Sequence, residues 1–175
     1  MSPLNFVRSA VAPVAFCVAL LASVTGSLPA QAANADPAAE AWVADVSQQA
    51  IKIISDKSLD RAGREAQFSA LLDTNADMQR IAAFCLGQFL RTPTPDQKNE
   101  YIKLFDNFVV KVYVTRLSDY HDEKLVITGS QLKGDTQPLV RSQIHFTNTR
   151  DPVKLTSWLL NVAIGYKLFD VNVVG

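Results

Sequence analysis

The sequence has no excess of charge of either sign, because 17 Lys and Arg residues balance 17 Asp and Glu residues over 175 positions. The chain therefore lacks the positive field that attracts a nucleic-acid backbone. Charged residues make up only 19% of the sequence and hydrophobic residues 48%, which excludes an intrinsically disordered chain. The composition predicts one folded domain with no nucleic-acid partner.

Residue patterns that carry catalysis or metal binding are also missing. The two histidines, His121 and His145, begin no H-x-x-x-H or H-x-E spacing, and no glycine-rich loop suits a phosphate. A nucleophilic group of Ser142, His145 and Asp170 fails on geometry, because strand alternation puts Ser142 and His145 on opposite faces. We therefore predict that the protein is not an enzyme and has no metal or cofactor.

The N-terminal segment has the pattern of a secretion signal. Arg8 precedes an apolar run from Ala10 to Val24, which is shorter than a membrane-spanning helix requires. The run is followed by Ala30-Gln31-Ala32, a cleavage site of the A-x-A type. We expect residues 1–32 to be a signal peptide, with a retained membrane anchor as the alternative, and residues 33–175 to form the mature domain.

Cysteine is scarce in the expected mature domain. Of the two cysteines, Cys17 lies in the signal segment, so only Cys85 remains after cleavage and no intrachain disulfide can form. Its neighbours Phe84 and Leu86 are apolar, which favours a buried structural thiol over a reactive one.

Apolar residues at spacings of three and four predict helices up to about residue 120. One amphipathic helix covers residues 42–54, and a second short helical stretch closes with Phe68, Leu71 and Leu72. A third stretch begins near Asn75 or Asp77 and is marked by Ile81, Phe84, Cys85 and Phe89. Thr94, Pro95 and Gln97 then provide an N-cap, a first-turn proline and a capping-box partner for a long helix over 95–120. The apolar residues of this helix cover about half of its circumference, which suggests contacts on two sides. The alternative for its second half is a strand over Phe108–Thr115.

Beyond Asp122 the apolar period changes to two. Alternation predicts strands over residues 125–129, 140–146, 153–160 and 166–174, with Gly134-Asp135 in the first turn. Short links between consecutive strands imply an antiparallel meander, because parallel pairing needs crossover connections. We predict an α+β fold, in which N-terminal helices pack on a C-terminal four-stranded antiparallel sheet.

Several short motifs, in their order along the chain, resemble one family. They are Leu86-Gly87, Arg91-Thr92, the helix start at Thr94-Pro95 with Gln97, Val140-Arg141-Ser142, Trp158, and Gly165-Tyr166-Lys167-Leu168-Phe169-Asp170-Val171. From Trp42 to Gly175 the chain resembles the MlaC-type, or toluene-tolerance, periplasmic phospholipid-binding proteins, which have hopanoid-associated relatives. The resemblance implies that residues 33–175 are a lipid-binding domain with an apolar pocket between helices and sheet.

The function implied by the resemblance is lipid transport across the periplasm. Such a carrier moves a phospholipid, or a hopanoid, between an inner-membrane ABC transporter complex and an outer-membrane lipoprotein complex. Family members continue into further helical sequence after the strand at Asp170–Val173, so we expect this segment to be missing here. Two other functions stay open: a ligand-free adaptor that binds envelope proteins, and a small α+β envelope enzyme whose polar candidates are Asp170, Tyr113 and His145.

Candidate lipid-binding residues are the apolar residues that the two periods place on helix and sheet faces, although the same periods describe an ordinary core. The candidates are Phe84, Phe105, Phe108, Val112 and Tyr113 in the helices and Val140, Ile144, Trp158, Phe169 and Val171 in the strands. Arg80 and Arg91 flank an apolar helix, and they are candidates for contact with a lipid headgroup or a partner protein.

Overall fold

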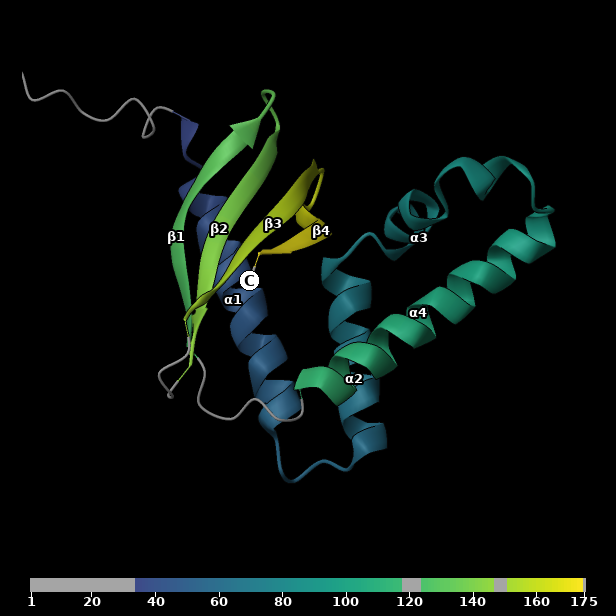
Figure 1. Ribbon diagram of the computed structural model, residues 1–175, viewed down its shortest axis with the longest axis horizontal. Helices are drawn as coiled ribbons and strands as arrows, with labels where there is room; N and C mark the ends of the chain where they lie inside the picture. The colour runs from purple at the N-terminus through teal and green to yellow at the C-terminus, as the bar shows by residue number, and fades with distance from the viewer. Residues whose placement is uncertain (1–33, 118–123, 147–150, 175) are drawn as a thin grey trace, which may run out of the picture. The chain divides into compact units, whose positions relative to one another are not determined.

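The computed structural model describes residues 34–117, 124–146 and 151–174, which all belong to one compact unit, Gln31–Gly175. In this part of the chain, four α-helices and a 3₁₀ turn precede a four-stranded sheet (Figure 1), so the predicted α+β class is confirmed. The expected signal peptide lies outside the described residues, among which no helix is long and apolar enough to cross a membrane. The elements are α1 (Pro37–Ser55), α2 (Arg61–Asn75), α3 (Met78–Leu86), η2 (Gly87–Arg91), α4 (Pro95–Leu117), β1 (Lys124–Lys133), β2 (Gln137–His145), β3 (Val153–Val162) and β4 (Gly165–Val174).

Polar side chains fix where the helices begin. Asp36, Asp60 and Asp77 each accept a hydrogen bond from the backbone N–H three residues later, at 2.9, 2.7 and 3.1 Å. The predicted capping box of α4 is also present. Gln97 N–H donates to Thr94 Oγ1 at 3.3 Å, and Thr94 N–H donates to Gln97 Oε1 at 2.9 Å. These bonds satisfy backbone donors that a helix start would otherwise leave without partners.

α4 is helical over its whole length, so the alternative of a strand over Phe108–Thr115 is wrong. Valine has a modest preference for strands, but the spacing of three and four residues lets both sides of the helix bury apolar groups. The packing of the helix therefore outweighs the local propensity. The predicted last residues of this helix, 118–120, lie outside the described residues.

The four strands form the predicted meander, in which each strand pairs antiparallel with the next. Val140 lies opposite Ser157, which lies opposite Val171, so these residues share one face. Leu159 shares this face with Val140, and both pack against α1. We call this face the inner face of the sheet. The register shifts between Trp158 and Leu159, where β4 holds one extra residue.

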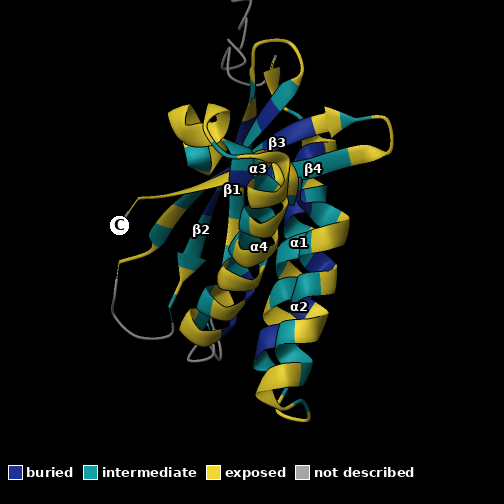
Figure 2. Ribbon diagram, turned by 90° about the vertical axis from the view of Figure 1, so that its right-hand side faces the viewer, coloured by how far each residue is buried: buried dark blue, intermediate teal, exposed yellow. Residues whose placement is uncertain are grey.

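Two clusters of buried residues stabilise the described part. Figure 2 colours the buried residues dark blue along the ribbon. The first cluster lies between α1 and the inner face, and consists of Ala39, Val43, Val140 and Leu159. The second lies among the helices, and consists of Ile54, Phe68, Leu71, Val110 and Val114. Since α1 contributes to both clusters, this helix links the sheet to the helical layer. The two clusters share no residue.

A polar network attaches the beginning of α1 to two strands. Asp36 N–H donates to Ser130 Oγ in β1 at 2.8 Å, and the Ser130 hydroxyl donates to Glu40 Oε1 at 2.6 Å. From β4, the Tyr166 hydroxyl donates to both carboxylate oxygens of Asp36 at 3.0 Å. Burial, and then the hydrogen bond to Asp36, raises the pKa of Tyr166 above its usual value. This end of α1 is therefore held on the sheet.

Candidate functional site

The helix α4 has apolar residues on two opposite sides. One side packs against α2 through Val110 and Val114. The opposite side carries a stripe of apolar residues, which a rotation of about 100° per residue brings into line. The stripe consists of Tyr101, Phe105, Phe108 and Val112. α4 therefore has an apolar surface on each of two sides, as the sequence suggests.

The beginning of this stripe contacts α3. The Tyr101 hydroxyl donates to the Ala82 carbonyl of α3 at 3.2 Å, and the Tyr101 and Phe105 rings lie 5.9 Å apart. One turn further, the Phe108 side chain is 63% exposed, and Leu104 beside it is 60% exposed. Figure 2 shows the exposed residues along α4. This helix therefore presents large apolar side chains to the surroundings.

The inner face of the sheet is also covered only in part. Val171 lies opposite Ser157 and Val173 lies opposite Leu155, so both valines belong to the inner face. Val171 is 36% exposed and Val173 60% exposed, whereas Val140 under α1 is fully buried. We refer to Leu104, Phe108, Val171 and Val173 together as the uncovered apolar residues.

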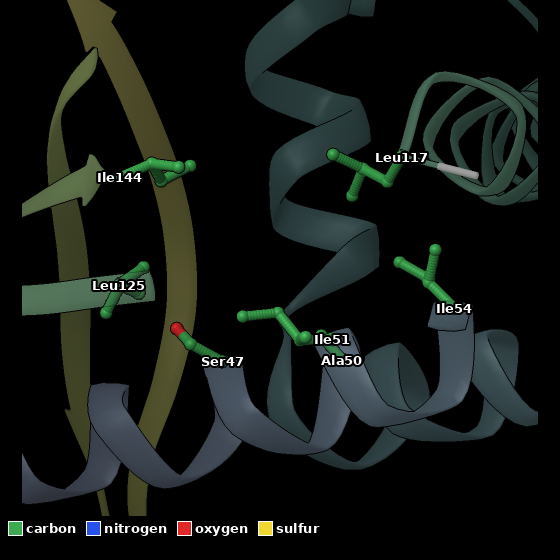
Figure 3. A pocket seen from close by; sticks show the side chains of 7 residues that line it. All are labelled: Ser47, Ala50, Ile51, Ile54, Leu117, Leu125 and Ile144. Carbon is green, nitrogen blue, oxygen red and sulfur yellow. The ribbon is translucent and has the colours of Figure 1, made fainter. Parts of the chain in front are cut away.

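An apolar cavity of about 150 Å³ lies where the helical layer meets the sheet (Figure 3). Side chains from the sheet and from the helices point into it from opposite sides, and Ser47 contributes the one hydroxyl among them. The lining residues are Ser47, Ala50, Ile51 and Ile54 of α1, Leu117 of α4, Leu125 of β1 and Ile144 of β2. The cavity therefore lies between the two buried clusters, at the end of α1 that the polar network does not hold.

The structure brings some of the predicted lipid-binding residues together but not all of them. Ile144 lines the cavity, while Val140 is buried beneath α1. Three aromatic residues form a second group: the Phe169 ring lies 4.9 Å from Trp158 and 5.3 Å from Phe84 of α3. Of the remaining candidates, Phe105 and Val112 are half-buried, and Phe108, Tyr113 and Val171 are exposed.

Sequence reasoning missed most of the cavity lining. The α1 residues Ala50 and Ile54 belong to a periodic apolar pattern, but the pattern does not show which neighbour the helix face meets. Leu117 and Leu125 lie on either side of the connection between helices and strands. The two ends of a short connection between packed layers lie near each other. Apolar residues on either side of the connection could therefore have been predicted to share a site.

Two further expectations concern α3 and the η2 turn that follows it. Arg80 and Arg91 are both exposed, and Arg80 forms an ion pair with Asp77 at 3.3 Å. The expectation that Cys85 is buried is wrong, because this residue is exposed. Residues adjacent in a helix point about 100° apart, so apolar neighbours say little about the burial of the residue between them.

The polar residues considered above for catalysis differ in their burial. Ser142 is buried on the inner face and His145 is exposed, in agreement with the predicted alternation. Asp170, Tyr113 and His145, the candidates for an enzyme, are all exposed. No three His, Cys, Asp or Glu side chains of the described ranges are placed to hold a metal ion.

Asp106 carries a buried oxygen at the contact between α4 and α2. Its Oδ1 atom has no hydrogen-bond partner among the described residues. Burial, and then the negative charge of Asp73 on α2, raises the pKa of Asp106 above its usual value. Since the pKa is higher in the folded state, proton binding favours folding below the unfolded pKa, and this gain is lost as the pH rises through the folded pKa.

We therefore expect Asp106→Asn to raise the free energy of unfolding at pH 7 by less than about 1 kcal/mol, because the amide has no charge to desolvate and solvent already screens part of the carboxylate. Urea unfolding followed by circular dichroism measures the change. The advantage over the wild type should shrink as the pH is lowered and Asp106 takes up a proton. Asp135→Asn in the exposed β1–β2 turn is the control, and equal stability of Asp106→Asn and wild type at pH 7 would contradict the expectation.

The fold and the site define an α+β protein with large apolar side chains exposed on its helical layer and on its sheet. The chain belongs to the MlaC family, whose profile, described as MlaC protein, matches residues 44–175. One solved structure with the same fold is a phospholipid-binding protein from Ralstonia solanacearum in complex with a phospholipid. It aligns with a TM-score of 0.64 and 24% sequence identity, over 81% of this chain and 79% of that chain. At this identity the likeness shows the fold alone.

Proposed function

We propose that the protein is a periplasmic carrier that binds the acyl chains of a phospholipid, or of a hopanoid, between its helical layer and its sheet. The observation behind the proposal is the exposure of the uncovered apolar residues, led by Phe108 at 63%. Exposed apolar patches of folded proteins are frequently binding surfaces. Membership of the MlaC family supports a lipid as the occupant, and so does the phospholipid bound to the Ralstonia solanacearum protein.

The cavity takes only part of a lipid in this proposal. Its volume of about 150 Å³ is below the roughly 300–1,000 Å³ of most small-molecule pockets. Two acyl chains of about 15 methylenes each present roughly 24 kcal/mol of apolar surface to water, at about 0.8 kcal/mol per methylene. The chains would therefore extend from the cavity over the uncovered apolar residues. To admit them, the helical layer would move away from the sheet at the end of α1 that the polar network does not hold.

The same energetics explain why a carrier is useful in the periplasm. A free lipid crosses water slowly, because its acyl chains lose their apolar surroundings, and a protein that covers them removes most of this cost. We propose that the lipid moves between an inner-membrane ABC transporter complex and an outer-membrane lipoprotein complex. A partner that binds the lipid-free conformation more tightly would drive release.

We expect lipid to co-purify with the protein. Mass spectrometry of an organic extract of the protein, purified from the periplasm without detergent, should find about one diacyl lipid or hopanoid per chain. A periplasmic protein of another family, purified in parallel, controls for adhering lipid. If the extract holds no more lipid than this control while circular dichroism shows the folded protein, the ligand-free adaptor is the better explanation. The intact mass of the same sample tests whether the mature chain begins near Ala33.

A further inference from the structure

The two edges of the sheet differ in how they are protected against pairing with another strand. Lys124 and Lys133 stand at the two ends of β1, and a bulge interrupts this edge between Ile127 and Gly129. Lysines and bulges are devices that keep an edge strand from pairing. β4 has a lysine, Lys167, and a bulge near its beginning, but its residues 170–174 include one charged residue, Asp170, and no lysine, arginine or proline, and all five are exposed.

The edge of β4 is occupied only near the beginning of the strand. Ala76, between α2 and α3, forms a bridge with Leu168, and Asp77 N–H donates to the Leu168 carbonyl at 3.0 Å. The Lys167 ammonium donates to the Thr74 carbonyl. Beyond the bulge, no strand of the described ranges pairs with β4 from Asp170 to Val174 on this edge.

We propose that this free edge pairs with the same edge of a second copy of the chain, antiparallel about a two-fold axis at Asn172. In a continuous sheet, residues directly opposite each other point to the same face. A two-fold axis between two identical antiparallel strands therefore lies midway between the two copies of one residue. Leu168 already pairs with Ala76, and the bulge interrupts the regular strand before Asp170. Residues 170–174 are therefore the regular stretch that can pair with another strand. An axis at its central residue uses all five positions.

The strand is complementary to itself in this register. Val171 lies opposite the Val173 of the other copy, so the inner apolar faces of the two sheets continue across the junction, and β-branched pairs stabilise such contacts. Asp170 lies opposite Val174, and the two Asp170 residues are four positions apart along the strands, about 13 Å at 3.3 Å per residue. Self-complementarity is what a two-fold contact requires, and it favours a second copy over an unrelated peptide.

A contact of five residues per strand is small, so the dimer should be weak and in exchange with the monomer. Cross-linking captures such a complex. In a Cys85→Ser background, Asn172→Cys places the two thiols opposite each other, with Cα atoms about 4.5–5.5 Å apart, within the range of a disulfide. Asp170→Cys is the matched control, since its thiols are too far apart. Under mild oxidation we expect Asn172→Cys to give at least about tenfold more dimer on non-reducing gels than Asp170→Cys.

Sedimentation of the protein without added cysteines provides a second readout. The dimer fraction should rise with concentration, Asn172→Lys should abolish it by placing two positive charges together, and Thr128→Lys on exposed β1 should leave it unchanged. Equal cross-linking at positions 170 and 172, or a wild-type protein that stays monomeric in the millimolar range, overturns the proposal. So does stronger cross-linking of Phe108→Cys, which would indicate association through the uncovered apolar residues. These readouts need no bound lipid, so they stand or fall separately from the carrier function.

Discussion

Phe108→Asp should remove most of the co-purifying lipid while the protein stays folded. The Phe108 side chain is 63% exposed, so its replacement disturbs neither buried cluster. Losing the contact of a phenylalanine with acyl chains costs roughly 1.5–3 kcal/mol of binding free energy, and placing a carboxylate against the chains costs more. At 1.4 kcal/mol for each factor of ten, lipid affinity should fall roughly 10- to 100-fold or further.

The matched control makes the same chemical change elsewhere. Ile164 lies in the turn between β3 and β4, is 87% exposed, and belongs neither to the cavity lining nor to the uncovered apolar residues. Ile164→Asp should keep the wild-type lipid content, measured by mass spectrometry of extracts from equal amounts of folded protein. A full lipid content in Phe108→Asp, with circular dichroism unchanged, would place the acyl chains away from this side of α4.

The architecture could be predicted from the sequence because its signals are local. The capping box at Thr94 and Gln97 marks the start of α4, and the change of apolar period after Asp122 separates helices from strands. Short connections then leave an antiparallel meander as the simplest sheet. Each of these signals involves neighbours in the chain, and each is confirmed where the residues are described.

The site could be predicted only in part, because periodicity identifies apolar faces but not what covers them. Val140 belongs to the alternating apolar pattern of its strand, and Phe108 belongs to the apolar spacing of its helix. Nevertheless, Val140 is fully buried under α1 and Phe108 is largely exposed. Cys85 fails for the same reason, since its exposure depends on where α3 lies. The cavity residues of α1 depend on the angle between that helix and the sheet, which is fixed by distant contacts such as Tyr166 with Asp36.

Leu159→Ala should lower the stability of the protein and Leu104→Ala should lower its lipid affinity, although both substitutions remove the same atoms. Leu159 is fully buried between α1 and the inner face, so its truncation leaves a cavity and should lower the free energy of unfolding by about 2–5 kcal/mol. Of the roughly 5–15 kcal/mol that stabilise a typical domain, this is a large share. Urea unfolding of lipid-free protein measures it.

Leu104 is 60% exposed, so Leu104→Ala should change the stability of the lipid-free protein by no more than about 0.5 kcal/mol. Its lipid affinity should nevertheless fall by roughly 1–2 kcal/mol, because part of the leucine surface no longer covers the acyl chains. Lipid in the sample would obscure the difference, since a ligand that binds only the folded state stabilises it, so both variants are stripped of lipid before unfolding. If Leu104→Ala destabilised the lipid-free protein as much as Leu159→Ala, Leu104 would belong to the core, and the separation between stabilising clusters and lipid-binding residues would not hold.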